Sequence, residues 1–214
     1  MTSKADKLLQ RALQQLKIEN KSSEEKFNNI YKLMPVLDSF NKEELFSVST
    51  TGTISERICG WALDAALPDG YFRNTSNEDK WLGDYIMLGA PFNVVISVKS
   101  YKAKERLLVS GSGSLLVPTI GWGLFDDPTE FKLERLKNYL YRGFIAIYMP
   151  KSTLKLLDSD TKKLENTHKE IFIRPIENLI SDIRKSKIKK KFGKTSIEVV
   201  NPKIFLSIFQ IFAM

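Results

Sequence analysis

Three side chains that could act together on a phosphate ester lie close along the chain: Asp84, Ser97 and Lys99. A carboxylate is a hard oxygen ligand of the kind that Mg²⁺ prefers. A lysine beside that carboxylate can steady an attacking water or the charge that develops on the phosphate oxygens. The sequence therefore indicates phosphodiester hydrolysis with Mg²⁺ as cofactor.

A β-hairpin is expected to position these three residues. Residues 83–88 and 93–100 are strand-like runs rich in Val and Ile, and Gly-Ala-Pro-Phe at 89–92 is typical of a turn. Side chains alternate along a strand, so Ser97 and Lys99 should share one face with Asn93 and Val95. Asp84 opens the partner strand, where pairing can bring its carboxylate near that face.

Helices and further strands are expected around the hairpin. The pattern Thr53-x-x-Glu56 is typical of a capping box, and it predicts a helix over 53–67 that ends before Pro68. Apolar spacing predicts a helix over 4–18 and a second over 24–34 that Pro35 ends, with Asn41 capping a short third helix. The other expected elements are a strand at 115–120, a helix at 126–141 with Gly143 as its C-cap, a strand at 144–149 and a helix within 175–186.

Composition narrows the class of protein. The chain has 214 residues, of which 43% are hydrophobic, enough for a sizeable core. An excess of 33 Lys and Arg over 25 Asp and Glu gives a net charge of +8, which favours a polyanionic partner. A lone cysteine, Cys59, and a lone histidine, His168, exclude a disulfide framework and a multi-histidine metal centre.

Targeting signals are not expected. The N-terminus has no apolar stretch of the signal-peptide kind, and the lone cysteine suits a reducing cytoplasm. The apolar end at 204–214 is far shorter than the ~20 residues that span a bilayer, so we expect it to dock on protein. Cys59, Trp81 and Trp122 are expected in the core.

The expected elements over 53–149 follow the order helix, strand, strand, strand, helix, strand, and Asp84 and Ser97-Val98-Lys99 lie on the strands. This pattern resembles the PD-(D/E)XK nuclease superfamily, and within it the type II restriction endonucleases. The resemblance implies an α/β fold in which a central mixed β-sheet is flanked by helices. It divides the chain into a helical region at 1–52, a nuclease-like core at 53–149 and a basic, apolar-tipped extension at 150–214, all within one compact domain.

The resemblance also implies roles for the site residues. In that superfamily an Asp and a second acid, two residues before the Lys, bind the metal; here Ser97 holds the second position. A subset of restriction enzymes with Ser-x-Lys takes the missing carboxylate from a neighbouring helix. Glu56 and Glu105 are the candidates. We favour Glu56 as the metal ligand beside Asp84, and its alternative role is that of the glutamate in the capping box of its own helix.

Cationic side chains beyond the site are candidate DNA contacts. Lys102, Lys104 and Arg106 continue the strand that carries Lys99, where phosphates or guanine edges could lie. The run 184–194 suits non-specific phosphate contact through its lysines, and the candidates are Lys187, Lys189, Lys190 and Lys191. The alternatives are an exposed lysine-rich edge strand and a solvated helix end.

The resemblance implies Mg²⁺-dependent, sequence-specific hydrolysis of double-stranded DNA by a cytoplasmic homodimer that does not bind membranes, with a cognate DNA methyltransferase as partner. A repair or recombination nuclease of the same superfamily, such as a junction resolvase, is the alternative among enzymes. A non-catalytic nucleic-acid-binding protein is the alternative outside them, and a peripheral membrane or scaffold protein is a third hypothesis.

Overall fold

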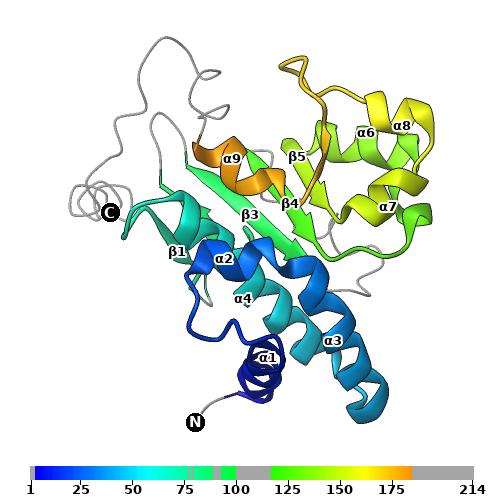
Figure 1. Ribbon diagram of the computed structural model, residues 1–214. Coiled ribbons are helices and arrows are strands. Elements are labelled where there is room, and N and C mark those ends of the chain that lie inside the picture. The colour runs from blue at the N-terminus through cyan, green and yellow to red at the C-terminus, as the bar shows by residue number, and fades with distance from the viewer. Residues whose placement is uncertain (1–2, 77, 79, 89–92, 100–116, 185–214) are drawn as a thin grey trace.

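The chain folds around a six-stranded mixed β-sheet, with the strands in the order β1-β2-β3-β4-β5-β6 (Figure 1). The computed structural model describes residues 3–76, 78, 80–88, 93–99 and 117–184. Strands β1, β2 and β3 form an antiparallel meander, and β3 to β6 are parallel neighbours. The strands are β1 (Phe72–Asn74), β2 (Tyr85–Met87), β3 (Val94–Lys99), β4 (Thr119–Gly123), β5 (Phe144–Met149) and β6 (Ile173–Pro175).

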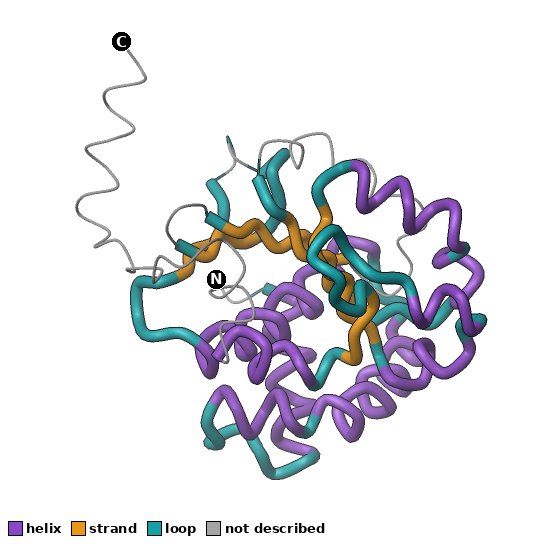
Figure 2. Tube along the Cα trace, turned by 90° about the horizontal axis from the view of Figure 1, so that it is seen from above, coloured by secondary structure: helices purple, strands orange, loops and turns teal. Residues whose placement is uncertain are grey.

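Helices cover both faces of this sheet (Figures 1 and 2). Before the sheet come α1 (Lys4–Gln15), α2 (Ser23–Asn28), α3 (Ile30–Glu44) and α4 (Val48–Ala66). Within and after it come the 3-10 helix η1 (Pro128–Phe131), α6 (Leu133–Tyr141), α7 (Lys151–Leu156), α8 (Ser159–Lys163) and α9 (Asn178–Arg184). No helix in these described ranges is both long and apolar enough to cross a membrane.

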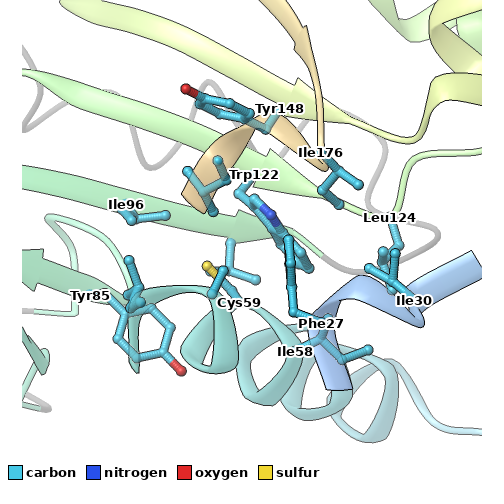
Figure 3. Close-up of a cluster of buried hydrophobic side chains, with 14 of the residues drawn as sticks. Phe27, Ile30, Ile58, Cys59, Tyr85, Ile96, Trp122, Leu124, Tyr148 and Ile176 are labelled. Carbon is cyan, nitrogen blue, oxygen red and sulfur yellow. The ribbon is translucent and has the colours of Figure 1, made fainter. Parts of the chain in front are cut away.

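Alternate residues of β5 show how the two layers arise. Ala146 and Tyr148 belong to the larger core cluster, together with residues of α1 to α4 and α9. Ile147 and Met149 face the other way and belong to a second cluster with residues of η1 and α6. Because side chains alternate along a strand, one apolar run supplies both cores. Figure 3 shows the larger cluster, in which Cys59 and Trp122 lie between α4 and the sheet.

Most of the expected elements are present. The hairpin is confirmed, because Tyr85 pairs with Ile96 and Met87 with Val94 in antiparallel register. The strand at 144–149 is confirmed at both ends. Gly143 follows α6 with a φ of 85°, the left-handed conformation that glycine adopts at low cost. The mixed α/β sheet expected from the sequence is therefore the observed architecture.

Pro35 does not end a helix, so the predicted boundary there was wrong. It lies inside α3, whose flanking residues Leu33 and Leu37 are buried. Proline deletes one backbone hydrogen bond, and the burial of apolar neighbours on both sides offsets that loss. Asn41 caps no third helix either; it lies near the end of α3, where its side-chain oxygen accepts the backbone N–H of Phe46 at 2.8 Å.

Several predicted boundaries shift. The strand expected at 115–120 is β4, at Thr119–Gly123. The helix expected over 126–141 is divided into η1, which Asp127 caps, and α6. The helix expected within 175–186 is the shorter α9. The sequence reasoning did not identify β1, β6, α7 or α8, each of six residues or fewer, because short elements carry little periodic signal.

A buried polar network fastens α9 to the sheet. The hydroxyl of Tyr148 donates to Asp182 at 2.9 Å, and the guanidinium of Arg174 donates to the same carboxylate oxygen at 3.0 Å. Arg174 also donates to Glu170 at 2.7 Å. Both partners of the Arg174–Asp182 pair are nearly excluded from solvent, with side chains 11% and 8% exposed.

The substitution Asp182→Ala should make the chain unfold more easily, because it removes one of the two carboxylates that pair with the buried Arg174 and leaves the Tyr148 hydroxyl without its acceptor. We expect a loss of about 3–5 kcal/mol in the free energy of unfolding, measured by urea denaturation. The exposed pair Glu134–Lys137 provides the control, since Glu134→Ala should cost under about 1 kcal/mol. Equal losses in the two variants would contradict a structural role for the buried network.

Candidate active site

Asp84 lies immediately before β2 and is fixed against β3. Its backbone N–H donates to the carbonyl of Ile96 at 2.8 Å, and its carboxylate Oδ2 accepts the N–H of Val98 at 2.6 Å. Its own carbonyl accepts the N–H of Thr75 at 3.1 Å. The Asp84 carboxylate thus accepts a β3 backbone N–H in the way that a carbonyl of a neighbouring strand would. This hydrogen bond holds the carboxylate beside Val98, which precedes Lys99 in sequence.

Gly83 makes this close approach possible. A Cβ atom added at this position would lie 2.9 Å from the carbonyl oxygen of Ile96 and would also collide with the side chain of Val95. Only glycine therefore lets the chain enter β2 so near to β3. The hydroxyl of Thr75 donates to the Gly83 carbonyl at 2.7 Å and closes the loop between β1 and β2.

Lys99 ends β3 and is half-buried, as expected for a lysine inside an apolar strand. Its register partner on β4 is Gly123, and that of Ser97 is Gly121, so the neighbouring strand offers no side chain beside either residue. Ser97 is fully buried, and its hydroxyl finds no hydrogen-bond partner in the described part of the chain. An unpartnered buried hydroxyl is unfavourable, which makes Ser97 a candidate to hold a water or ligand group.

The structure changes the local role of Glu56. The predicted capping box was wrong: α4 begins five residues before Thr53, at Val48, and its cap is Ser47, whose hydroxyl accepts the N–H of Thr50 at 3.2 Å. Glu56 lies more than two turns into the helix, where no backbone N–H needs a side-chain acceptor. Its carboxylate is therefore available for another purpose.

The charges of Asp84 and Lys99 both act on Glu56, which lies on a different element from either. α4 packs across the face of the sheet that carries Ile96 (Figure 3). The hydroxyl of Tyr85 donates to the backbone carbonyl of Glu56 at 2.7 Å. Both carboxylates are half-buried. The arrangement collects two acids and one lysine from three elements that are far apart in sequence, α4, the start of β2 and the end of β3.

Burial sets the electrostatics of both acids. Desolvation raises the pKa of Asp84, and the charges of Lys99 and Lys80 and the Val98 N–H oppose this rise. Desolvation also raises the pKa of Glu56, and the negative charge of Asp84 raises it further, whereas the positive charges nearby lower it. Two partly desolvated carboxylates that repel each other gain most from a bound cation.

The donor set fits a divalent metal. Asp84 and Glu56 supply hard oxygen ligands of the kind that Mg²⁺ binds. No cluster of three or more His, Cys, Asp or Glu side chains suited to a metal occurs among the described residues. Water and phosphate oxygens usually complete a Mg²⁺ shell, so two carboxylates are compatible with such a site.

Sequence reasoning missed two residues of this neighbourhood and misplaced a third. Lys80 is exposed, yet its charge acts on both carboxylates. The sequence indicates Tyr85 only as a strand residue. Trp81 was expected in the core but is 57% exposed, whereas Trp122 and Cys59 are fully buried as predicted. The closeness of Lys80 to Asp84 in sequence, four residues before it, could have indicated that its charge acts on the Asp84 carboxylate.

The other predicted site residues lie outside the described residues. These are Glu105, the strand cations Lys102, Lys104 and Arg106, and the basic-run lysines Lys187, Lys189, Lys190 and Lys191.

The fold is restriction-endonuclease-like: a mixed six-stranded sheet flanked by helices. Among solved structures, the chain is similar to the restriction endonuclease PspGI in its complex with substrate DNA, with a TM-score of 0.52 and 15% sequence identity. The similarity covers 85% of this chain and 92% of that one. No protein-family model matches the chain, and no curated protein matches it in sequence.

The raised pKa of Glu56 predicts a cost to stability in the metal-free protein. A carboxyl whose folded pKa exceeds its unfolded pKa stabilises the fold least at high pH, and stability falls as pH rises through that window. Glu56→Gln should therefore raise the melting temperature at pH 8 by about 1–3 °C and change it little near pH 4.

Two measurements distinguish the loss of the Glu56 charge from a general effect of replacing glutamate by glutamine. The exposed Glu134 gives the matched control, since Glu134→Gln should not stabilise the protein at pH 8. Added Mg²⁺ should raise the melting temperature of the unsubstituted protein more than that of Glu56→Gln. A lower melting temperature for Glu56→Gln at pH 8 without metal would contradict the interpretation that the charged Glu56 carboxylate destabilises the fold.

Proposed function

We propose that this chain is a Mg²⁺-dependent endonuclease that hydrolyses phosphodiester bonds of double-stranded DNA, and that it acts as a type II restriction endonuclease with a Ser-x-Lys site. The observation that carries the proposal is the electrostatic interaction of Asp84 with both Glu56 and Lys99, with the Asp84 carboxylate bonded to the backbone of β3. Its support is a fold similar to that of a restriction endonuclease solved with substrate DNA.

The residues have separate roles in the proposed reaction. Asp84 and Glu56 hold the cation, and the Val98 N–H keeps the Asp84 carboxylate in one orientation. A bound Mg²⁺ would polarise the scissile phosphate and lower the pKa of a coordinated water. Lys99 orients the attacking water and offsets the charge that develops on the phosphate oxygens. Ser97 lines the site with a hydroxyl that is free to accept or donate.

Glu56 is the proposed second carboxylate, in preference to Glu105. Its helix presents it to Asp84, and the negative charge of Asp84 acts directly on it. Comparing Glu56→Gln with Glu105→Gln in a Mg²⁺ titration of cleavage tests the choice. Loss of cleavage only in Glu105→Gln would transfer the ligand role to Glu105.

DNA contacts are proposed for the predicted cations. Lys102, Lys104 and Arg106 follow Lys99 in sequence and would touch the backbone or base edges near the cut. The four candidate lysines within the 184–194 run, Lys187, Lys189, Lys190 and Lys191, would neutralise phosphates. Replacing those four by Gln should make the slope of log K against log salt shallower, by up to about 0.9 for each phosphate that a lysine no longer neutralises.

The proposed enzyme would act as a homodimer and together with a DNA methyltransferase. A homodimer would match a short palindromic site, because a two-fold protein reads a two-fold sequence. A cognate DNA methyltransferase would protect host DNA, and both proteins would work in the cytoplasm. Sequencing the ends of cleaved DNA tests the symmetry, since a dimer of this kind cuts both strands at symmetric positions.

Incubation of the purified protein with unmethylated phage DNA, with Mg²⁺ or with EDTA, tests the function. We expect discrete fragments only with Mg²⁺. Asp84→Asn and Lys99→Ala should each lower the cleavage rate by about 100-fold or more while DNA binding in Ca²⁺ persists. The exposed Lys137→Ala is the control and should cut normally.

Three results would contradict the proposal. Near-normal cleavage by Asp84→Asn or Lys99→Ala would remove the assigned site. Cleavage confined to branched substrates would indicate a repair or recombination nuclease. Salt-sensitive DNA binding without any Mg²⁺-dependent cleavage would indicate a binding protein instead of an enzyme.

A further inference from the structure

A hydrogen bond joins the two chain segments that carry the carboxylates. The hydroxyl of Tyr85 donates to the backbone carbonyl of Glu56 at 2.7 Å, and Tyr85 directly follows Asp84 in sequence. The Tyr85 side chain is 3% exposed, so water competes little for this bond. Its ring also lies against Phe72 of β1, with the ring centroids 6.0 Å apart.

Gly60 makes room for this bond on α4. A Cβ atom at this position would lie 3.0 Å from the Tyr85 hydroxyl oxygen and 3.7 Å from the ring carbon that carries it. The first separation is tighter than ordinary contact and the second is normal. Glycine is a poor helix former, so its presence inside α4 has a local explanation in the approach of the Tyr85 hydroxyl.

Apolar residues of α4 also pack against the sheet. Ile58, Cys59 and Ala62 are fully buried against the strands. Apolar packing is non-directional, whereas a hydrogen bond fixes both distance and angle. Asp84 is already fastened to β3 through Ile96 and Val98, so the position of α4 along the sheet sets how far Glu56 lies from it.

We propose that Tyr85 and Gly60 form a positioning pair that sets the spacing of Glu56 and Asp84 and thereby the affinity of the site for a divalent cation. The inference rests on the proposed function and names two residues that touch neither the metal nor the substrate. Tyr85 acts through the helix backbone, and Gly60 acts by leaving the space that Tyr85 needs.

The first test is Tyr85→Phe, which keeps the ring and removes the hydroxyl. We expect the Mg²⁺ concentration for half-maximal cleavage, and the dissociation constant for Mn²⁺ measured by calorimetry without DNA, to rise about 3- to 10-fold. Tyr148→Phe is the matched control, because it also removes a buried hydroxyl that donates a hydrogen bond, here to Asp182. It should lower the melting temperature without changing the affinity for either ion.

The second test is a double-mutant cycle. Gly60→Ala should weaken Mn²⁺ binding about as much as Tyr85→Phe, because the new methyl group displaces the hydroxyl. In the Tyr85→Phe background the same substitution should cause no further loss, since the ring carbon is at a normal distance from the methyl group. Independent, multiplying effects of the two substitutions would overturn the proposal, as would an unchanged Mn²⁺ affinity in Tyr85→Phe.

The outcomes for the unsubstituted protein separate this inference from the function on which it rests. Mn²⁺ binding and Mg²⁺-dependent cleavage by the unsubstituted protein, with unchanged affinity in Tyr85→Phe, would overturn the positioning pair alone. Absence of both binding and cleavage in the unsubstituted protein would overturn the proposed function and the inference together.

Discussion

The packing of α4 across β2 and β3 is the constraint on which the rest of the structure depends. Residues of α4 that are fully excluded from water, such as Ile58, Cys59 and Leu63, form the centre of the larger core. The same packing brings the middle of α4 to β2, where the Tyr85 hydroxyl bonds the Glu56 carbonyl and the charge of Asp84 acts on Glu56. The apolar contacts that stabilise the domain therefore also bring the candidate site residues into one neighbourhood.

The charges of the two acids reduce the stability that this packing provides. Two half-buried carboxylates with raised pKa values disfavour the charged, folded state unless a cation joins them. The chain holds them in place with directional bonds from the backbone, at Ile96 and Val98 for Asp84 and from the Tyr85 hydroxyl at the Glu56 carbonyl. Because these bonds fix the backbone that carries the two acids, their mutual repulsion remains as a cost to stability.

Two further sets of contacts stabilise the half of the sheet that contains β5 and β6. Residues of η1 and α6 pack on the opposite face of β5, and the buried bonds among Tyr148, Asp182 and Arg174 fasten α9 to the sheet. The C-terminal half of the sheet is thus stabilised independently of the charged residues near Asp84. A domain built in this way can keep an unfavourable cluster at one edge without losing its fold.

Local alternation and turn residues were enough to predict the hairpin, the buried strand at 144–149 and the end of a helix before Pro68. The sequence could not place Pro35 inside α3, because the burial of Leu33 and Leu37 offsets the local cost of proline only in the folded chain. It left Glu56 with two alternative roles, because Thr53-x-x-Glu56 matches a capping box locally and only the observed cap at Ser47 excludes that role. Tertiary packing decided that the charges of Glu56 and Asp84 act on each other and that the Tyr85 hydroxyl joins their segments, since no local pattern records which helix turn will meet which strand.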